Sequence, residues 1–200
     1  MQTQVLPVNE QSIALAAQLL RRGELVALPT ETVYGIAADA RNPEAVKKIF
    51  AAKGRPQDNP LIVHIAGMEM LAGIVSAVPE RARKLAAAVW PGPLTMVLPR
   101  GPEVADVTCA GLDTVGVRMP SHPVVQAVIR ASGVAFAAPS ANLSGKPSPT
   151  NAADTLADMD GRLPLILDGG DSAVGVESTV VSLAGEHPML LRPGYITREQ

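Results

Sequence analysis

The sequence predicts an α/β protein with one mixed β-sheet covered by helices. Short runs of aliphatic and β-branched residues alternate along the chain with segments whose apolar residues recur at helical spacing. Apolar residues make up 47% of the 200 residues and charged residues 18%, a composition that fills a core and excludes a disordered chain. The 17 glycines and 18 prolines predict many defined turns between the elements. We expect one domain, since single cores commonly span ~100–200 residues.

Helix start and stop signals divide the first half of the chain. Asn9 can cap a helix that Gly23 ends, and Asn42 can cap a second helix that Gly54 ends. Pro43 stands at the first position of the second helix, where its missing N–H costs nothing. Around these two helices the expected elements are, in order, strands at Glu24–Leu28 and Leu61–Ile65, helices at Met68–Ala77 and Glu80–Val89, a turn at Trp90–Pro93 and a strand at Leu94–Leu98.

The second half of the chain continues this alternation without an internal sequence repeat. A loop rich in Ser, Pro and Gly lies between its second strand and its second helix. The expected elements are a strand at Val115–Met119, a helix at Pro123–Ala131, a strand at Val134–Ala138, a helix at Asn151–Met159 and strands at Leu163–Leu167, Ser178–Leu183 and Met189–Leu191. We therefore expect about eight strands and about five helices in total.

The charge balance limits the possible partners. The chain has 17 basic and 19 acidic residues, a net charge of −2 at pH 7. Residues 1–100 carry +3 (11 basic, 8 acidic) and residues 101–200 carry −5 (6 basic, 11 acidic). A generally basic surface, typical of RNA-binding proteins, is thereby excluded, whereas local basic clusters remain.

Cysteine usage and apolar patterning indicate the compartment. The single cysteine, Cys109, excludes an intramolecular disulfide and a cysteine-based zinc site. The N-terminal residues lack the basic start and apolar stretch of a secretory signal. No apolar run approaches the ~20 residues that span a bilayer. We therefore expect a cytoplasmic protein that does not contact membranes.

Several common site types are absent from the sequence. It contains no G-x-G-x-x-G after a strand, no G-x-x-x-x-G-K-[ST], no H-E-x-x-H and no G-x-S-x-G. The three histidines, His64, His122 and His187, lie too far apart for a local metal-binding motif. We therefore expect a reaction that needs neither a side-chain nucleophile nor a protein-bound metal.

Three polar clusters follow predicted strands or helices, where α/β proteins commonly bind ligands. Pro29–Gly35 combines two hydroxyls, a carboxylate and a phenol, and Ser140–Thr150 carries hydroxyls and an amide. Lys53–Pro60 contains two cations in a loop stiffened by proline, an arrangement that suits a polyphosphate. Each cluster alone also fits a capped turn, cations at a helix end or a polar surface loop. Together they indicate one cleft for an anionic ligand, with further polar groups from Arg118, Glu177–Thr179 and Arg192.

These clusters belong to longer blocks that resemble the YrdC-like threonylcarbamoyl-AMP synthase family. The blocks are PTETVYGIAADA (29–40), KGRPQDNPLIVHI (53–65), WPGPLTMVLP (90–99), VGVRMPSHP (115–123), APSANLSGKPSPT (138–150), LDGG (167–170), ESTVV (177–181) and LLRPGYIT (190–197). The resemblance implies a twisted open α/β sheet with a large concave, locally basic cleft. It also implies a reaction in which L-threonine, bicarbonate and ATP give threonylcarbamoyl-AMP and pyrophosphate, for threonylcarbamoyladenosine modification of ANN-decoding tRNAs by a downstream tRNA threonylcarbamoyl transferase machinery.

The resemblance also implies roles for individual residues. The catalytic, phosphate-binding set matches Lys53, Arg55, Ser140 and Asn142. Further ATP contacts match Asn59, Thr114, Ser148 and Arg192. Threonine contacts match Thr32, His64, Arg118, Ala138 (through its backbone) and Ser178. In this mechanism the nucleophile is a carbamate made from the substrates, and Mg²⁺ arrives with ATP rather than on the protein.

The sequences of these blocks are most similar to those of the longer family members, which add a linker and a second domain after the equivalent of Thr197. Because the sequence ends at Gln200, we expect a single catalytic domain over residues 1–200 without the second domain. Two alternatives remain. An RNA- or tRNA-binding module of the same superfamily would have little stacking surface with five aromatic residues, although weak tRNA binding is compatible with the sequence. A carbamoyl-transfer relative would carry zinc-type cysteine motifs, which are missing here.

Overall fold

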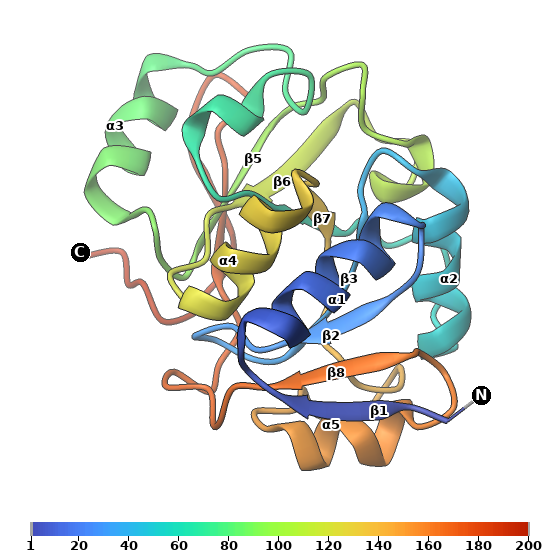
Figure 1. The fold of residues 1–200 in the computed structure, drawn as a ribbon. Helices are drawn as coiled ribbons and strands as arrows, with labels where there is room; N and C mark the ends of the chain where they lie inside the picture. The colour runs from blue at the N-terminus through green and yellow to red at the C-terminus, as the bar shows by residue number, and fades with distance from the viewer. Residues whose placement is uncertain (1, 200) are drawn as a thin grey trace.

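The computed structural model describes residues 2–199 and confirms the α/β fold (Figure 1). Ten strands form one sheet, and five α-helices and two short 3₁₀ helices accompany it within the described residues. In chain order the elements are β1 (Gln4–Pro7), α1 (Glu10–Arg21), β2 (Val26–Leu28), β3 (Gly35–Asp39), α2 (Pro43–Lys53), β4 (Ile62–His64), η1 (Met68–Leu71), α3 (Glu80–Val89), β5 (Leu94–Pro99), η2 (Asp106–Thr108), β6 (Thr114–Arg118), α4 (Pro123–Ser132), β7 (Phe136–Ala137), α5 (Ala152–Met159), β8 (Leu165–Asp168), β9 (Thr179–Ser182) and β10 (Met189–Arg192).

The sheet is mixed, as the sequence predicts. Its strands follow the order β1-β8-β2-β3-β7-β4-β6-β5-β9-β10. The pairs β1–β8, β8–β2, β4–β6 and β5–β9 are parallel, and the remaining neighbours are antiparallel. Strands distant in the sequence therefore lie side by side, and loops from both halves of the chain meet over the middle of the sheet.

Side chains of the buried strands alternate between two hydrophobic clusters, one on each face. In β2, Ala27 packs in the cluster that contains Ile49 of α2, whereas Val26 packs in the cluster that contains Leu20 of α1 and Ile129 of α4. Helices α1 and α4 therefore cover one face, and Figure 1 shows them in front of the sheet. Helices α2, α3 and α5 contribute to the other cluster.

Beyond β7, the face that α1 and α4 cover continues as a polar strip. His64 pairs with Phe136, which belongs to the α1/α4 cluster, so both side chains lie on that face. Arg118 of β6 pairs with His64, and Thr95 of β5 pairs with Arg118. Because paired residues share a face, His64, Arg118 and Thr95 form a row across three strands. Two members of this row, His64 and Arg118, line the site described below.

Several predicted elements differ from the structure. The predicted helix at Met68–Ala77 is wrong beyond the 3₁₀ turn Met68–Leu71, because Gly73 takes a φ of +80°, which ends the turn. The strand predicted at Val134–Ala138 shortens to β7. Strands β1 and β3 were not predicted: β1 is short and largely exposed, and the Gly/Ala-rich sequence of β3 has low β-propensity. No helix within residues 2–199 has the length and apolar character needed to cross a membrane.

Candidate functional site

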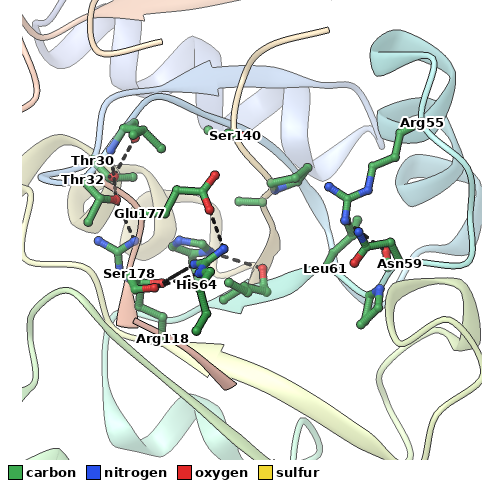
Figure 2. Close-up of a pocket in the computed structure, with 17 residues that line it drawn as sticks. Thr30, Thr32, Arg55, Asn59, Leu61, His64, Arg118, Ser140, Glu177 and Ser178 are labelled. Carbon is green, nitrogen blue, oxygen red and sulfur yellow. Dashed lines mark hydrogen bonds and ion pairs between the residues drawn. The ribbon is translucent and has the colours of Figure 1, made fainter. Parts of the chain in front are cut away.

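A cavity of about 280 Å³ lies over the polar strip, and its two ends differ in chemistry (Figure 2). Thr32, His64 and Arg118 line one end, and Arg55 and Asn59 line the other. The wall between them comes from the segment after β7 and from the β9–β10 region, through Ala138, Ser140, Glu177, Ser178 and Arg192. The cavity thus gathers six separate parts of the chain, at residues 30–35, 55–64, 118, 138–140, 177–178 and 192.

Arg118 is the central residue of the cavity end that Thr32 and His64 also line. Its guanidinium is almost fully buried and donates to Thr32 Oγ1 at 2.9 Å, to Glu31 Oε1 at 2.5 Å and to the Gly92 carbonyl at 3.3 Å. Burial alone would raise the pKa of Glu31, but the charge and hydrogen bond of Arg118 outweigh it and hold that pKa below its usual value. The pair therefore remains ionised, and Glu31 fixes the guanidinium beside the cavity.

His64 contributes a neutral imidazole to the same end. The ring is 4% exposed, and its Nδ1 lies 3.3 Å from the Ile62 carbonyl. Burial and the nearby charge of Arg118 lower the pKa of His64 to about 3. At physiological pH the ring can therefore exchange a hydrogen bond with a neutral ligand group without adding a second positive charge.

Glu177 forms hydrogen bonds with two other parts of the chain around the cavity. Its Oε1 accepts a hydrogen bond from Ser148 Oγ at 3.0 Å, and its Oε2 accepts one from Arg192 Nη1 at 2.5 Å. The other edge of the Arg192 guanidinium donates to the Ser178 carbonyl at 2.8 Å and to Ser178 Oγ at 3.1 Å. Ser178 Oγ also lies 2.8 Å from Thr95 Oγ1. This network connects β5, β9, β10 and the loop that contains Ser148.

Lys53 and Asn142 lie behind the cavity wall rather than on it. Lys53 ends α2, is 3% exposed, and donates to the carbonyls of Ser140 and Asn142, the latter at 2.7 Å. Asn142 Nδ2 donates to the carbonyls of Leu143 and Lys146, each at 2.8 Å. Burial and the charge of Arg55 lower the pKa of Lys53 to about 8. Both side chains therefore hold the loop that begins at Ser140.

Arg55 forms the opposite end of the cavity. It follows Gly54, which ends α2 in the left-handed conformation at a φ of +61°. It donates one long hydrogen bond, from Nη2 to the Asn59 carbonyl at 3.4 Å, and its buried Nε has no partner among the described residues. Burial lowers the pKa of Arg55, and the charge of Glu177 opposes that shift. This guanidinium therefore has donors available for an anionic ligand.

The structure brings most of the predicted site residues together. Those that line the cavity are Thr32, Arg55, Asn59, His64, Arg118, Ala138, Ser140, Ser178 and Arg192. Lys53, Asn142 and Ser148 are connected to the wall by hydrogen bonds. Thr114 begins β6, whereas Arg118 ends it, so Thr114 lies away from the Arg118 end of the cavity and does not line it.

Two acidic residues of the predicted polar clusters, Glu31 and Glu177, were given no individual role by the sequence. Their hydrogen bonds with Arg118, and with Arg192 and Ser148, join residues that are far apart in the chain. Within residues 2–199, no group of three or more His, Cys, Asp or Glu side chains is placed to hold a metal ion.

Comparisons with known proteins give consistent matches. Residues 18–194 match the family model of Sua5, YciO and YrdC proteins, which is described as "Telomere recombination". Threonylcarbamoyl-AMP synthase of Bacillus subtilis (strain 168) is 56% identical over 199 residues, which are 99% of this chain and 58% of that protein. The protein of the same name from Pyrococcus abyssi (strain GE5 / Orsay) is 52% identical over 193 residues, which are 96% of this chain and 57% of that protein.

A solved structure also matches closely. The crystal structure of P. abyssi Sua5 complexed with L-threonine superimposes with a TM-score of 0.94 at 52% identity, over 96% of this chain and 58% of that one. The chain therefore spans less than two thirds of the length of these relatives.

Proposed function

The chain belongs to the Sua5/YciO/YrdC family, and from this premise we propose that it carries the active site of a threonylcarbamoyl-AMP synthase. The reaction joins L-threonine, bicarbonate and ATP into threonylcarbamoyl-AMP and releases pyrophosphate and water. The product would serve a tRNA threonylcarbamoyl transferase machinery that modifies adenosine in ANN-decoding tRNAs. We further propose a single catalytic domain over residues 1–200, cytoplasmic localisation and Mg²⁺ that arrives with ATP.

The observation that carries this proposal is the Arg118 end of the cavity. A buried guanidinium beside a hydroxyl and a neutral imidazole fits an amino acid with a carboxylate and a side-chain hydroxyl. Arg118 and Thr32 would bind the threonine carboxylate, and His64 would exchange a hydrogen bond with the threonine hydroxyl. Ser178 and the Ala138 backbone would complete this half, as they line the same wall. A relative that is 52% identical was solved with L-threonine bound.

The nucleotide half would lie toward Arg55. Arg55, Asn59 and Ser140 line this end, and Arg192 lies on the wall between the two ends. Lys53 and Asn142 would support it from behind, because they fix the backbone of the loop that begins at Ser140. The three cations Lys53, Arg55 and Arg192 would balance the charge of the triphosphate. Ser148 and Thr114 complete the proposed nucleotide set.

The chemistry needs no nucleophile from the protein. The threonine ammonium group loses a proton, and the resulting amine takes up bicarbonate with loss of water, which gives a carbamate. A carbamate oxygen then attacks the α-phosphorus of ATP, and the bond to the β,γ-pyrophosphate breaks. The protein would hold the two reactants in line and stabilise the charge on the phosphorus oxygens. The order of the two halves along the cavity suits this attack, since the amine and the α-phosphate would meet between Arg118 and Arg55.

Pyrophosphate release from ATP tests the proposal directly. We expect release with threonine, bicarbonate and ATP together, and no release above background when threonine or bicarbonate is omitted. Mass spectrometry with ¹³C-bicarbonate should place the label in threonylcarbamoyl-AMP. Release that continues without threonine would indicate an ordinary ATP hydrolase and would contradict the proposal.

A further inference from the structure

Glu177 is the acidic residue among the described residues that line the cavity. The cations that line it have been assigned to the two substrates, Arg118 to threonine and Arg55 and Arg192 to the nucleotide. The lining includes Arg55, Arg118 and Arg192 but, within the described residues, no acid besides Glu177. Figure 2 shows the Glu177 carboxylate between the Arg118 end and the Arg55 end. A negative charge at this place opposes the binding of a polyphosphate, so its presence requires an explanation.

The contacts of Glu177 are those that a phosphate group would make. One carboxylate oxygen accepts from Ser148 Oγ at 3.0 Å, and the other accepts from Arg192 Nη1 at 2.5 Å. The remaining edge of Arg192 is held by Ser178, so Nη1 is the donor that it has left to offer to a ligand. A hydroxyl and a guanidinium nitrogen that converge on two oxygens of one anionic group form a typical phosphate-binding arrangement.

The charge of Glu177 also reaches the other nucleotide cations. Burial lowers the pKa of Lys53 to about 8 and lowers the pKa of Arg55, and the negative charge of Glu177 opposes both shifts. The Glu177 and Arg192 side chains are 42% and 39% exposed, so their ion pair is partly hydrated and can open at low cost. Glu177 itself precedes β9 and is not part of the strand ladder, so its side chain can turn away without breaking strand pairing.

We infer that the Glu177 carboxylate competes with the nucleotide phosphates for Arg192 and Ser148, and that Glu177 thereby sets the affinity of the cavity for ATP. The inference rests on the proposed function, which assigns Arg192 and Ser148 to the nucleotide. When ATP binds, a phosphate oxygen replaces the carboxylate on Arg192 Nη1, and the Glu177 side chain turns toward solvent. Glu177 keeps the cations paired until a ligand with several negative charges displaces it, and weakly charged anions compete poorly.

Calorimetric binding of ATP and of inorganic triphosphate to the wild type and to Glu177→Gln tests the inference. The substitution keeps the shape of the side chain and removes its charge. We expect roughly fivefold tighter binding of both ligands at ~50 mM salt, the factor that corresponds to ~1 kcal/mol for a half-exposed ion pair. Glu177→Ala should shift the affinity in the same direction. The gain should shrink as salt rises, because screening weakens exposed charge interactions.

Glu186→Gln is the matched control. Glu186 lies in the exposed β9–β10 connection, and its removal changes the net charge of the protein by the same amount without touching the cavity. We expect triphosphate affinity within twofold of the wild type for this variant. If Glu186→Gln gained as much triphosphate affinity as Glu177→Gln, the effect would come from the net charge of the protein alone, and this result would overturn the inference.

Other outcomes separate the competing roles of Glu177. Weaker ATP binding in both Glu177 variants would make the residue a clamp that orients Arg192, and a loss seen only with Mg²⁺ would make it a metal ligand. Tenfold weaker threonine binding would make it the partner of the substrate ammonium. Each of these results overturns the inference.

If the wild type forms no threonylcarbamoyl-AMP but Glu177→Gln still binds triphosphate more tightly, the proposed function fails and the inference holds. If triphosphate binds neither to the wild type nor to Glu177→Gln, this result contradicts the inference.

Discussion

At the scale of single residues, His64 is expected to decide how threonine is told from valine. Serine lacks only a methyl group, which is worth ~1–3 kcal/mol, so serine should react ~10–200-fold less efficiently. Valine keeps the shape but leaves the buried imidazole without its hydrogen-bond partner, so its rejection should approach ~10⁴-fold. Since the pKa of His64 is about 3, this discrimination should not change between pH 6 and 8.

The kcat/KM values for threonine, serine and valine in the wild type and in His64→Ala provide the measurement. In His64→Ala, the ratio of kcat/KM for threonine to that for valine should fall to about the ratio for threonine to serine. An unchanged ratio of threonine to valine would mean that His64 is a core residue and that another group reads the hydroxyl.

Lys53 should make ATP binding sensitive to alkaline pH. Its pKa of about 8 lies below the usual 10.5, so the side chain is charged at pH 7 and loses its charge as the pH rises through 8. ATP should bind the charged form better, so its Kd should rise above pH 8, by up to about tenfold per pH unit. Lys53→Arg, which stays charged, should remove this dependence. A Kd that is constant from pH 7 to 9.5 in the wild type would leave Lys53 with only its contacts to the loop carbonyls.

Single residues also show why the site was only partly predictable. Arg118 and Ser140 could be found because each follows a recognisable apolar run, and α/β proteins commonly place ligand-binding groups where strands end. The direction of a side chain cannot be read in the same way. Lys53 and Asn142 turn into the loop carbonyls, and Glu31 pairs with Arg118 across 87 positions of sequence. Such pairings depend on contacts that exist only in the folded chain.

At the scale of elements, the start of β9 is packed against the segment after β10. A Cβ atom on Gly194 would lie 2.5 Å from the Glu177 carbonyl oxygen and 2.7 Å from the Ser178 carbonyl carbon. Gly194→Ala should therefore push the 177–179 segment outward, lower the free energy of unfolding by ~1–3 kcal/mol and weaken the binding of both threonine and ATP. Isothermal titration and urea unfolding measure the two effects.

Gly185→Ala is the control for this prediction, because its Cβ atom would have its nearest neighbour at 3.9 Å and it lies in the same β9–β10 connection. Its stability and ligand affinities should match those of the wild type. Normal ligand binding by Gly194→Ala would show that the two halves of the cavity do not depend on where β9 begins.

The elements with local signals were predictable, and those that depend on neighbours were not. Asn42, Pro43 and Gly54 define α2 as expected, because a cap, a proline and a left-handed glycine act within one turn of the helix. Strand β3 has no such signal, and it forms because β2 and β7 supply hydrogen-bond partners on both sides. The 3₁₀ turn at Met68 resembles a helix in apolar spacing, but it ends after four residues.

At the scale of the whole molecule, the balanced charge predicts weak binding to RNA. With a net charge of −2, the chain can neutralise few phosphates outside the cavity. Unmodified tRNA should therefore bind no more tightly than about 10 µM at 150 mM salt, with a shallow dependence of log K on log salt. A filter-binding titration over salt concentration measures both. Submicromolar affinity with a steep salt dependence would favour the RNA-binding module instead.

The fold class was predictable because it follows from alternating periodicities, whereas the strand order was not. In the sheet, β8 lies between β1 and β2, and β9 lies beside β5, so chain order says little about adjacency. The cavity depends on this order, since β4, β6 and β5 place His64, Arg118 and Thr95 in one row. The blocks of sequence indicated which residues meet, and the sheet order explains how they do.

The central claim is that one cavity binds threonine at the Arg118 end and ATP at the Arg55 end, and binding of each ligand to two variants tests it most directly. The variants are Arg55→Gln and the double substitution Glu31→Gln/Arg118→Gln, which avoids leaving a buried carboxylate unpaired. We expect the double variant to lose threonine binding about 100-fold while its ATP affinity stays within about threefold, and Arg55→Gln to show the reverse. Loss of the same ligand in both variants, or of neither, would contradict the division of the cavity into two ends.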